Sequence, residues 1–160
     1  MLDYIYIYFS LQRAQCLGKL RDWLEELGYR DGDTMFGAPY DFRYAPPVPG
    51  QTSEVYSRYF SEFMALVEAA TKKKQKKAVI LGHSYGGMVA LEFVRSTPRA
   101  WRDAHIERLI LVAPTLQDGF VGSVMKFITG TGIIFVPTAT STRPMWRSFE
   151  SAMASFPSPA

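Results

Sequence analysis

One serine stands between two glycines in a pattern that carries chemistry: Gly82, His83, Ser84, Tyr85, Gly86. The five residues follow an apolar run and precede an amphipathic stretch, so they should join a buried strand to a helix. A Gly-x-Ser-x-Gly junction of this kind is typical of a nucleophile elbow, in which the serine has a strained backbone. Glycine is required two residues before and two after because the chain approaches itself closely there. The pattern predicts that Ser84 is a catalytic nucleophile.

The rest of a serine-based mechanism is only partly present. Tyr85 starts the expected helix, where its backbone N–H would point at the oxyanion of a tetrahedral intermediate. A base must also take the hydroxyl proton, but His83 shares the turn of Ser84 and is better interpreted as a packing or pocket-wall residue. His105, expected to start a strand, would lie roughly 26 Å from the active edge at about 3.3 Å per residue, and Asp118 is interpreted as a loop residue. No complete triad can be assembled, and a glycine-rich turn without catalysis remains an alternative.

Helix and strand signals alternate along the chain. Helices are expected over 12–27, from Thr52 or Ser53 to about Lys72, and from about Tyr85 to Ser96; strands are expected over 34–36, 78–81 and 106–113. One side of the second helix should carry Val55, Tyr59, Phe63, Leu66, Val67 and Ala70. Residues 4–9 alternate tyrosine with isoleucine or phenylalanine and are expected to form a strand or a disordered terminus. This order predicts an α/β fold with a parallel sheet covered on both faces, and with its chemistry after Leu81 and Ala113 at the carboxyl ends of the strands.

Composition excludes several classes of protein. The 160 residues are 48% hydrophobic and 21% charged, which is typical of a soluble globular domain. Cys16 is the only cysteine, so an internal disulfide and a multi-cysteine metal site are excluded. A net charge of +3 does not favour nucleic acid. No apolar run reaches the roughly 18 to 20 residues that span a bilayer, and the N-terminus lacks the basic residues of a secretory signal; the compartment is left open.

Two motifs together resemble the lecithin:cholesterol acyltransferase family, particularly its plant-type and phospholipid:diacylglycerol acyltransferase-like branches. The elbow, extended by Gly87, is shared by the whole α/β-hydrolase class. The specific element is Tyr40-Asp41-Phe42-Arg43, within residues 36–43. Further matches are Thr97-Pro98, Trp101 and Ala113-Pro114, and the resemblance runs from about Leu17 to Pro159.

The resemblance implies roles for individual residues. Ser84 would accept the acyl group and the Tyr85 N–H would be one oxyanion donor. Tyr40, Asp41, Phe42 and Arg43 would shape the site entrance, with Asp41 and Arg43 pairing. A buried structural turn with a satisfied ion pair is an equally supported alternative for this motif.

The resemblance also implies an incomplete α/β-hydrolase domain. In the family an earlier segment supplies the second oxyanion donor, and the catalytic Asp and His lie beyond residue 160. Residues 1–160 are therefore expected to form a single partial domain, with an atypical N-terminus over about 1–16 and a candidate lid or cap over about 115–160. After Ala113-Pro114 the chain departs from the family's usual Trp-Gly-Gly, which leaves the local pocket and lid geometry open.

The leading hypothesis is a lipid O-acyltransferase or phospholipase-like serine enzyme. It would move a fatty acyl group from a phospholipid through Ser84 to a sterol, a diacylglycerol or water, with no metal or organic cofactor implied. The substrate would be a phospholipid or another lipid, and the lysine run at 72–77 and the apolar segment 124–135 are candidates for peripheral membrane contact. A solvated loop and buried packing are the competing explanations for these two segments. A catalytically incomplete fragment and a generic lipase or esterase are the alternative functions.

Overall fold

The computed structural model describes residues 5–9, 15–47, 50–116 and 139–154. The chain divides into two compact units, each of which is described by itself. The first contains Met1–Tyr40 and Ser53–Pro114, and the second contains Asp41–Thr52 and Thr115–Ala160.

A four-stranded parallel sheet forms the centre of the first unit. The strands are β1 (Ile5–Phe9), β2 (Met35–Gly37), β3 (Ala78–His83) and β4 (Ile106–Val112), in the order β2-β1-β3-β4. All the pairings are parallel, so the carboxyl ends of the strands meet at one edge, where Phe9 pairs with Gly82 and His83 with Val112. The parallel sheet is confirmed, and Ile5–Phe9, for which the sequence left a strand or a disordered terminus open, is an inner strand of it.

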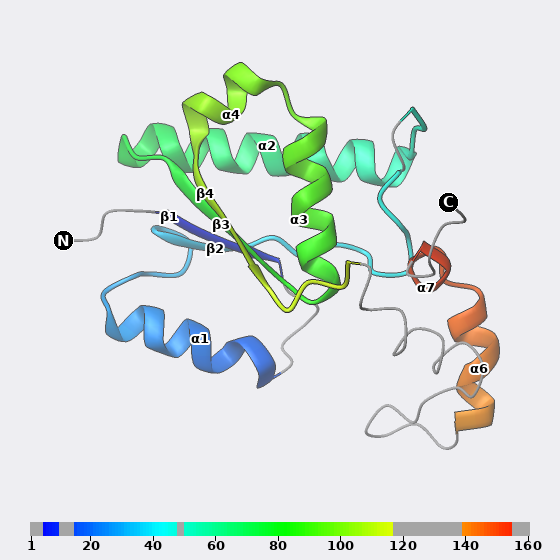
Figure 1. Cartoon of the computed structure of the whole chain (residues 1–160). Coiled ribbons are helices and arrows are strands. Elements are labelled where there is room, and N and C mark those ends of the chain that lie inside the picture. The colour runs from blue at the N-terminus through cyan, green and yellow to red at the C-terminus, as the bar shows by residue number, and fades with distance from the viewer. Residues whose placement is uncertain (1–4, 10–14, 48–49, 117–138, 155–160) are drawn as a thin grey trace. The chain divides into compact units, whose positions relative to one another are not determined.

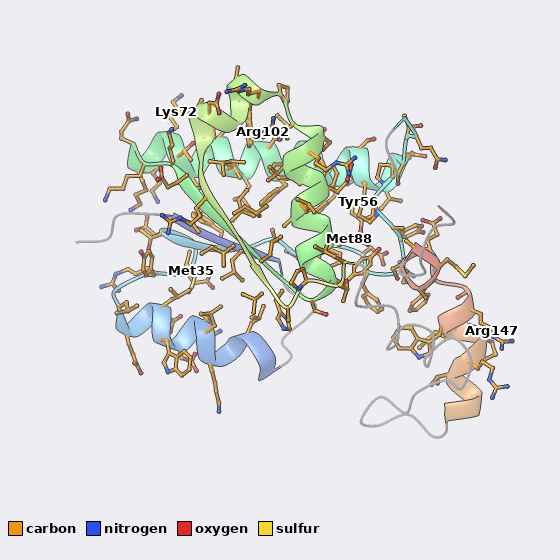
Figure 2. All side chains as sticks on the ribbon, in the orientation of Figure 1. Met35, Tyr56, Lys72, Met88, Arg102 and Arg147 are labelled. Atoms are coloured by element: carbon orange, nitrogen blue, oxygen red, sulfur yellow. The ribbon has the colours of Figure 1, made fainter. Side chains whose placement is uncertain are left out.

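Helices cover both faces of this sheet, as predicted (Figure 1). Helix α1 (Gln15–Glu26) lies on one face, and α2 (Glu54–Lys74) and α3 (Tyr85–Ser96) lie on the other. Met35 is fully buried and packs with Leu24 and Tyr29. Figure 2 marks Met35 between the sheet and α1. Burying large apolar side chains of this kind contributes roughly 1.5–3 kcal/mol each.

Local sequence signals explain where α2 begins and ends. The hydroxyl of Ser53 accepts a hydrogen bond from the N–H of Tyr56 at 3.4 Å, which caps the helix, and Gln75 ends it in the left-handed conformation with φ of 53°. The predicted apolar side was partly wrong: Val55 is exposed, whereas Tyr56 and Phe60 are buried. Phe63, Val67 and Ala70 are buried as predicted, so the buried stripe differs from the prediction mainly in the first half of the helix. The buried residues of α2 are Tyr56, Phe60, Phe63, Val67, Ala70 and Thr71.

A short helix that the sequence did not predict precedes the last strand. Helix α4 spans Arg99–His105 and contains no buried residue. His105 is therefore the last residue of a helix rather than the first residue of β4, so that prediction was wrong. Because Ala78 pairs with Ile106 at the amino end of the strands, His105 still lies at the edge opposite the one where β3 ends.

The second unit has its own small set of contacts. Helices α6 (Ala139–Arg147) and α7 (Glu150–Ala154) belong to it. The Phe42 ring meets the Phe149 ring edge-on at 5.4 Å, and the N–H of Ser151 donates to the carbonyl of Arg43 at 3.3 Å. Helix α7 is thus packed on the turn at 41–44. The apolar segment 124–135 and Asp118 lie outside the described residues.

Candidate active site

The backbone at Ser84 has the strained conformation that the sequence predicts for a nucleophile elbow. Ser84 connects β3 to α3 with φ of 54° and ψ of −127°. This region is sparsely populated for residues other than glycine and costs on the order of 1–3 kcal/mol unless the surroundings hold it. The strain places a half-buried serine at the carboxyl edge of the sheet, where parallel sheets build their sites.

Close packing of the backbone explains why glycines surround Ser84. A Cβ atom on Gly82 would lie 2.6 Å from the carbonyl oxygen of Gly86 and 2.7 Å from the Cα of Gly87. Both contacts are with backbone, which cannot move aside without opening the turn. A Cβ on Gly87 would lie 2.7 Å from the Cβ of Pro114. The elbow is therefore closed on two sides, by its own helix and by the segment that follows β4.

The end of β4 supports the elbow in a way that the sequence did not predict. The N–H of Ser84 donates to the carbonyl of Val112 at 3.0 Å, which extends the pairing of β3 with β4 by one residue. The next residue, Ala113, has φ of 42°, again in the left-handed region. This bend brings Pro114 against Gly87. The Ala-Pro dipeptide was the one available signal, because it marks a chain that cannot continue as a regular strand.

A comparison of two serines distinguishes structural capping from the geometry at Ser84. Ser53 and Ser84 both occupy the N-cap position of a helix. Ser53 has the extended backbone usual at this position, with φ of −128° and ψ of 120°, and its hydroxyl accepts from the helix. Ser84 makes no side-chain capping bond. Capping therefore does not explain a serine at position 84.

Tyrosine rings gather beside the elbow. The ring of Tyr40 lies 6.1 Å from that of Tyr85 and 6.4 Å from that of Tyr59. The hydroxyl of Tyr59, on α2, donates to the carbonyl of Ala38 at 3.0 Å. Burial raises the pKa values of Tyr40 and Tyr59 well above the usual value, with a further contribution of Tyr40 to the shift at Tyr59. Both phenols therefore stay neutral near neutral pH. The sequence predicted Tyr40 near the site, but it did not connect Tyr59 with it.

The other three residues of the predicted entrance motif belong to the second unit. Arg43 pairs with Asp41 through its guanidinium: Nε donates to Oδ1 at 2.8 Å and Nη2 to Oδ2, while the backbone N–H of Arg43 donates to Oδ1 at 3.1 Å. These bonds lower the pKa of Asp41. The predicted pairing is confirmed. The pair is not buried, since the Arg43 side chain is 59% exposed, and the alternative of a structural turn with a satisfied ion pair stays open. The roles of Asp41, Phe42 and Arg43 at a site entrance remain predictions.

The two histidines have different surroundings. His83 is the last residue of β3 and is half-buried, directly before Ser84. The Nδ1 of His105 lies 2.9 Å from the hydroxyl oxygen of Thr71. Its ring lies 4.9 Å from that of Trp101, whose indole N–H donates to Glu68 at 2.7 Å. His105 is thus part of the packing between α2 and α4.

The lysine run lies at the end of α2 rather than in a loop alone, so that part of the prediction was wrong. Lys72, Lys73 and Lys74 form the last turn of the helix, and Figure 2 marks Lys72 there. Lys73 and Lys74 donate to the two carboxylate oxygens of Asp33, at 2.7 and 2.6 Å. This turn therefore joins α2 to the segment before β2.

The described residues show neither a metal-binding cluster nor a membrane-spanning helix. Within the described ranges, no cluster of three or more His, Cys, Asp or Glu side chains is arranged to hold a metal ion. In the same part of the chain, no helix combines the length and apolar character needed to cross a membrane.

Comparison with known proteins places the chain in a family. The sequence model of the family described as lecithin:cholesterol acyltransferase matches residues 1–159. The chain belongs to this family. The match includes the first strand, β1, as well as the elbow and the Tyr40-to-Arg43 motif, so it extends further toward the N-terminus than the resemblance drawn from motifs alone.

The relatives of this family member are considerably longer than the chain. It is 36% identical over 138 residues to "Lecithin-cholesterol acyltransferase-like 1" of Oryza sativa subsp. japonica, covering 85% of this chain and 32% of the relative. The Arabidopsis thaliana protein of the same description is 34% identical over 107 residues, 66% of this chain and 24% of that protein. "Lysosomal phospholipase A and acyltransferase" of Homo sapiens is 32% identical over 83 residues, 52% and 18% of the two chains. The chain therefore spans about a third or less of these relatives.

Proposed function

We propose that this chain carries the nucleophile of a lipid O-acyltransferase or phospholipase-like serine enzyme, and that Ser84 is that nucleophile. The observation that supports the proposal most directly is the backbone of Ser84, with φ of 54° and ψ of −127° and no capping bond from its side chain. A residue that only starts a helix needs no strained backbone, and its side chain normally forms the capping bond that Ser84 lacks. Exposing a hydroxyl at the carboxyl edge of a parallel sheet requires a turn of this kind.

The proposed reaction proceeds in two acyl transfers. The Ser84 oxygen attacks the ester carbonyl carbon of a phospholipid, its proton passes to a general base, and the carbonyl oxygen becomes an oxyanion. The backbone N–H of Tyr85, at the start of α3, would stabilise that charge, because a helix N-terminus carries partial positive charge. Collapse breaks the ester bond, and the departing lysophospholipid oxygen takes the proton. The hydroxyl of a sterol, a diacylglycerol or water then attacks the acyl-serine in the same way.

Neither of the chain's two histidines is suited to be the general base, so we assign that role to another residue. His83 precedes Ser84 on the same turn, and His105 contacts Thr71 at the opposite edge of the sheet. A base must lie within hydrogen-bond reach of the serine. Because the chain spans about a third of the rice relative, activity is expected of the longest polypeptide that its transcript encodes and not of these 160 residues alone.

The described activities of relatives support lipid as the substrate class. Relatives are described as "Phosphatidylcholine-sterol acyltransferase" in Homo sapiens, 32% identical over 103 residues, and as "Lysosomal phospholipase A and acyltransferase". Both names indicate action on a phospholipid, and only the first names an acceptor, a sterol. We therefore propose a phospholipid donor for this chain, and we leave the choice among sterol, diacylglycerol and water to experiment, because it depends on how the pocket excludes water.

Acyl transfer from vesicles tests the proposal. The longest encoded polypeptide is incubated with phosphatidylcholine vesicles that carry a labelled acyl chain and either cholesterol or diacylglycerol, and labelled esters and free fatty acid are separated. Ser84→Ala should reduce the sum of these products by at least about a thousandfold, as loss of a serine nucleophile does. Ser61→Ala, on the exposed side of α2, is the matched control and should be unchanged. Equal turnover by Ser84→Ala and wild type would refute the proposal.

A further inference from the structure

The aromatic contacts beside the elbow form a continuous connection from α2 to Tyr85. Tyr59, in the second turn of α2, stacks on Phe63 with ring centroids 6.2 Å apart and an interplanar angle of 2°. Tyr59 also meets the Tyr56 ring edge-on at 6.1 Å. With its hydroxyl bonded to the carbonyl of Ala38 at 3.0 Å, Tyr59 is held by both its ring and its polar end.

Tyr40 continues this connection to the elbow. It lies two residues after Ala38, and its ring is 6.4 Å from Tyr59 at 61°, and 6.1 Å from Tyr85 at 36°. Aromatic rings at such separations attract one another in addition to the effect of the apolar area that they bury. Tyr40 is thus placed between a fixed ring on α2 and the residue that follows Ser84.

These ring contacts affect the position of the Tyr85 backbone N–H. The Tyr85 ring and its backbone nitrogen are joined through one Cα atom, so confining the ring limits displacement of that nitrogen and of its N–H. We infer that Tyr40 is a positioning residue that holds the oxyanion-donating N–H of Tyr85 in place through contact of the two rings. This inference rests on the proposed function of Ser84. Burial raises the pKa of the Tyr40 phenol, and the role proposed for Tyr40 is one of packing.

The test compares a tetrahedral adduct with a ligand that forms none. A long-chain alkyl trifluoromethyl ketone adds Ser84 to its carbonyl carbon: the oxygen–carbon bond forms, the carbonyl π bond opens to an oxyanion, and the serine proton passes to the general base. The corresponding trifluoromethyl alcohol binds the same pocket without this step. Loss of a whole oxyanion donor reduces rates by about 10²–10³. A variant in which the Tyr85 N–H is held less firmly should bind the ketone about tenfold more weakly and the alcohol less than about twofold more weakly, both measured on the longest encoded polypeptide.

Three variants and one control separate the role of the ring from general destabilisation. Tyr40→Leu should show the selective loss of ketone binding, and Tyr40→Phe, which keeps the ring, should bind like wild type. Tyr59→Phe loses the bond to Ala38 and should show a smaller loss of the same kind, about threefold. Tyr29→Ala removes a buried tyrosine from the cluster under α1; it should weaken folding without changing the ratio of the two affinities.

The outcomes distinguish the two claims. If wild type forms no covalent ketone adduct at Ser84, the proposed function fails and the inference fails with it. If wild type forms the adduct and Tyr40→Leu binds ketone and alcohol in the wild-type ratio, the inference is overturned and the proposed function stands. Should Tyr40→Leu not fold, Tyr59→Phe decides: an unchanged ratio in that variant overturns the inference.

Discussion

Ser84 and Ser53 show how one residue type serves different purposes at the same position of a helix. The Ser53 hydroxyl closes a cap, and its backbone is relaxed. At Ser84 the backbone is strained and the side chain does not cap. Backbone strain of this kind is held by the surrounding structure, here including the bond from the Ser84 N–H to the Val112 carbonyl, and it is frequent at functional sites. The strained backbone of Ser84 and its missing cap are thus the main physical support for Ser84 as a nucleophile.

Replacing Ser84 tests the strain directly. Glycine adopts φ of 54° without steric cost, whereas alanine keeps the strain, so Ser84→Gly should be more stable than Ser84→Ala by about 1 kcal/mol. At a relaxed position the order is normally reversed, because glycine loses more conformational entropy on folding. Urea denaturation of the two variants of the 160-residue chain measures the difference. If the alanine variant is equal or more stable, Ser84 is not strained in the folded chain.

At the scale of elements, the junction of β3 with α3 was predicted closely. Helix α3 spans the predicted residues from Tyr85 to Ser96, because the glycines fix its start and Pro98 prevents its continuation. Helix α4 was missed because it has seven residues, none of them buried, and so no apolar periodicity. The first half of the α2 stripe was placed wrongly because neighbouring apolar residues, such as Val55 and Tyr56, allow two adjacent faces.

The junction and a helix interior should respond oppositely to the same substitution. Gly82→Ala puts a Cβ 2.6 Å from a backbone oxygen, so we expect a loss of about 2 kcal/mol or more. Gly18→Ala, within α1, meets nothing within 4 Å and should stabilise the chain by about 0.5–1 kcal/mol. Denaturation midpoints of both variants against wild type provide the measurement. A Gly82→Ala variant as stable as wild type would show that the elbow does not close as described.

The contact of α2 with Asp33 predicts a dependence of stability on pH. Hydrogen bonds from Lys73 and then Lys74 lower the pKa of Asp33 from 3.8 to about 2. A lowered pKa means that the carboxylate stabilises the folded chain above 3.8, and that this contribution is lost as the pH falls through about 2. Urea midpoints of wild type and Asp33→Asn should therefore differ at about pH 6 and converge at about pH 2.

Salt provides the control for this pair. The side chains of Asp33 and Lys73 are 34% and 60% exposed, so added salt should reduce the difference between the two proteins at neutral pH. A difference that persists at low pH would contradict the ion pair and would indicate that the Asp33→Asn substitution alters packing instead.

At the scale of the whole molecule, the sheet edge was predictable and the contacts across it were not. Alternating elements predict a parallel sheet and place Ser84 and Ala113 at one edge. The pairings of Tyr40 with Tyr85 and of Tyr59 with Ala38 join residues that are far apart in sequence, and no local pattern indicates them. The sequence also treated Tyr40 to Arg43 as one motif, whereas the chain divides between Tyr40 and Asp41 into two compact units.

Covalent labelling of the serine tests the central claim most directly. The longest encoded polypeptide is treated with an alkyl fluorophosphonate, and its intact mass and proteolytic peptides are measured alongside Ser84→Ala. We predict one adduct per chain, on the peptide that contains Ser84, and no adduct in the variant. The 160-residue chain, whose two histidines are both unsuited as the base, should label far more slowly. An adduct on another residue, or equal labelling of wild type and Ser84→Ala, would contradict the assignment of Ser84 as the nucleophile.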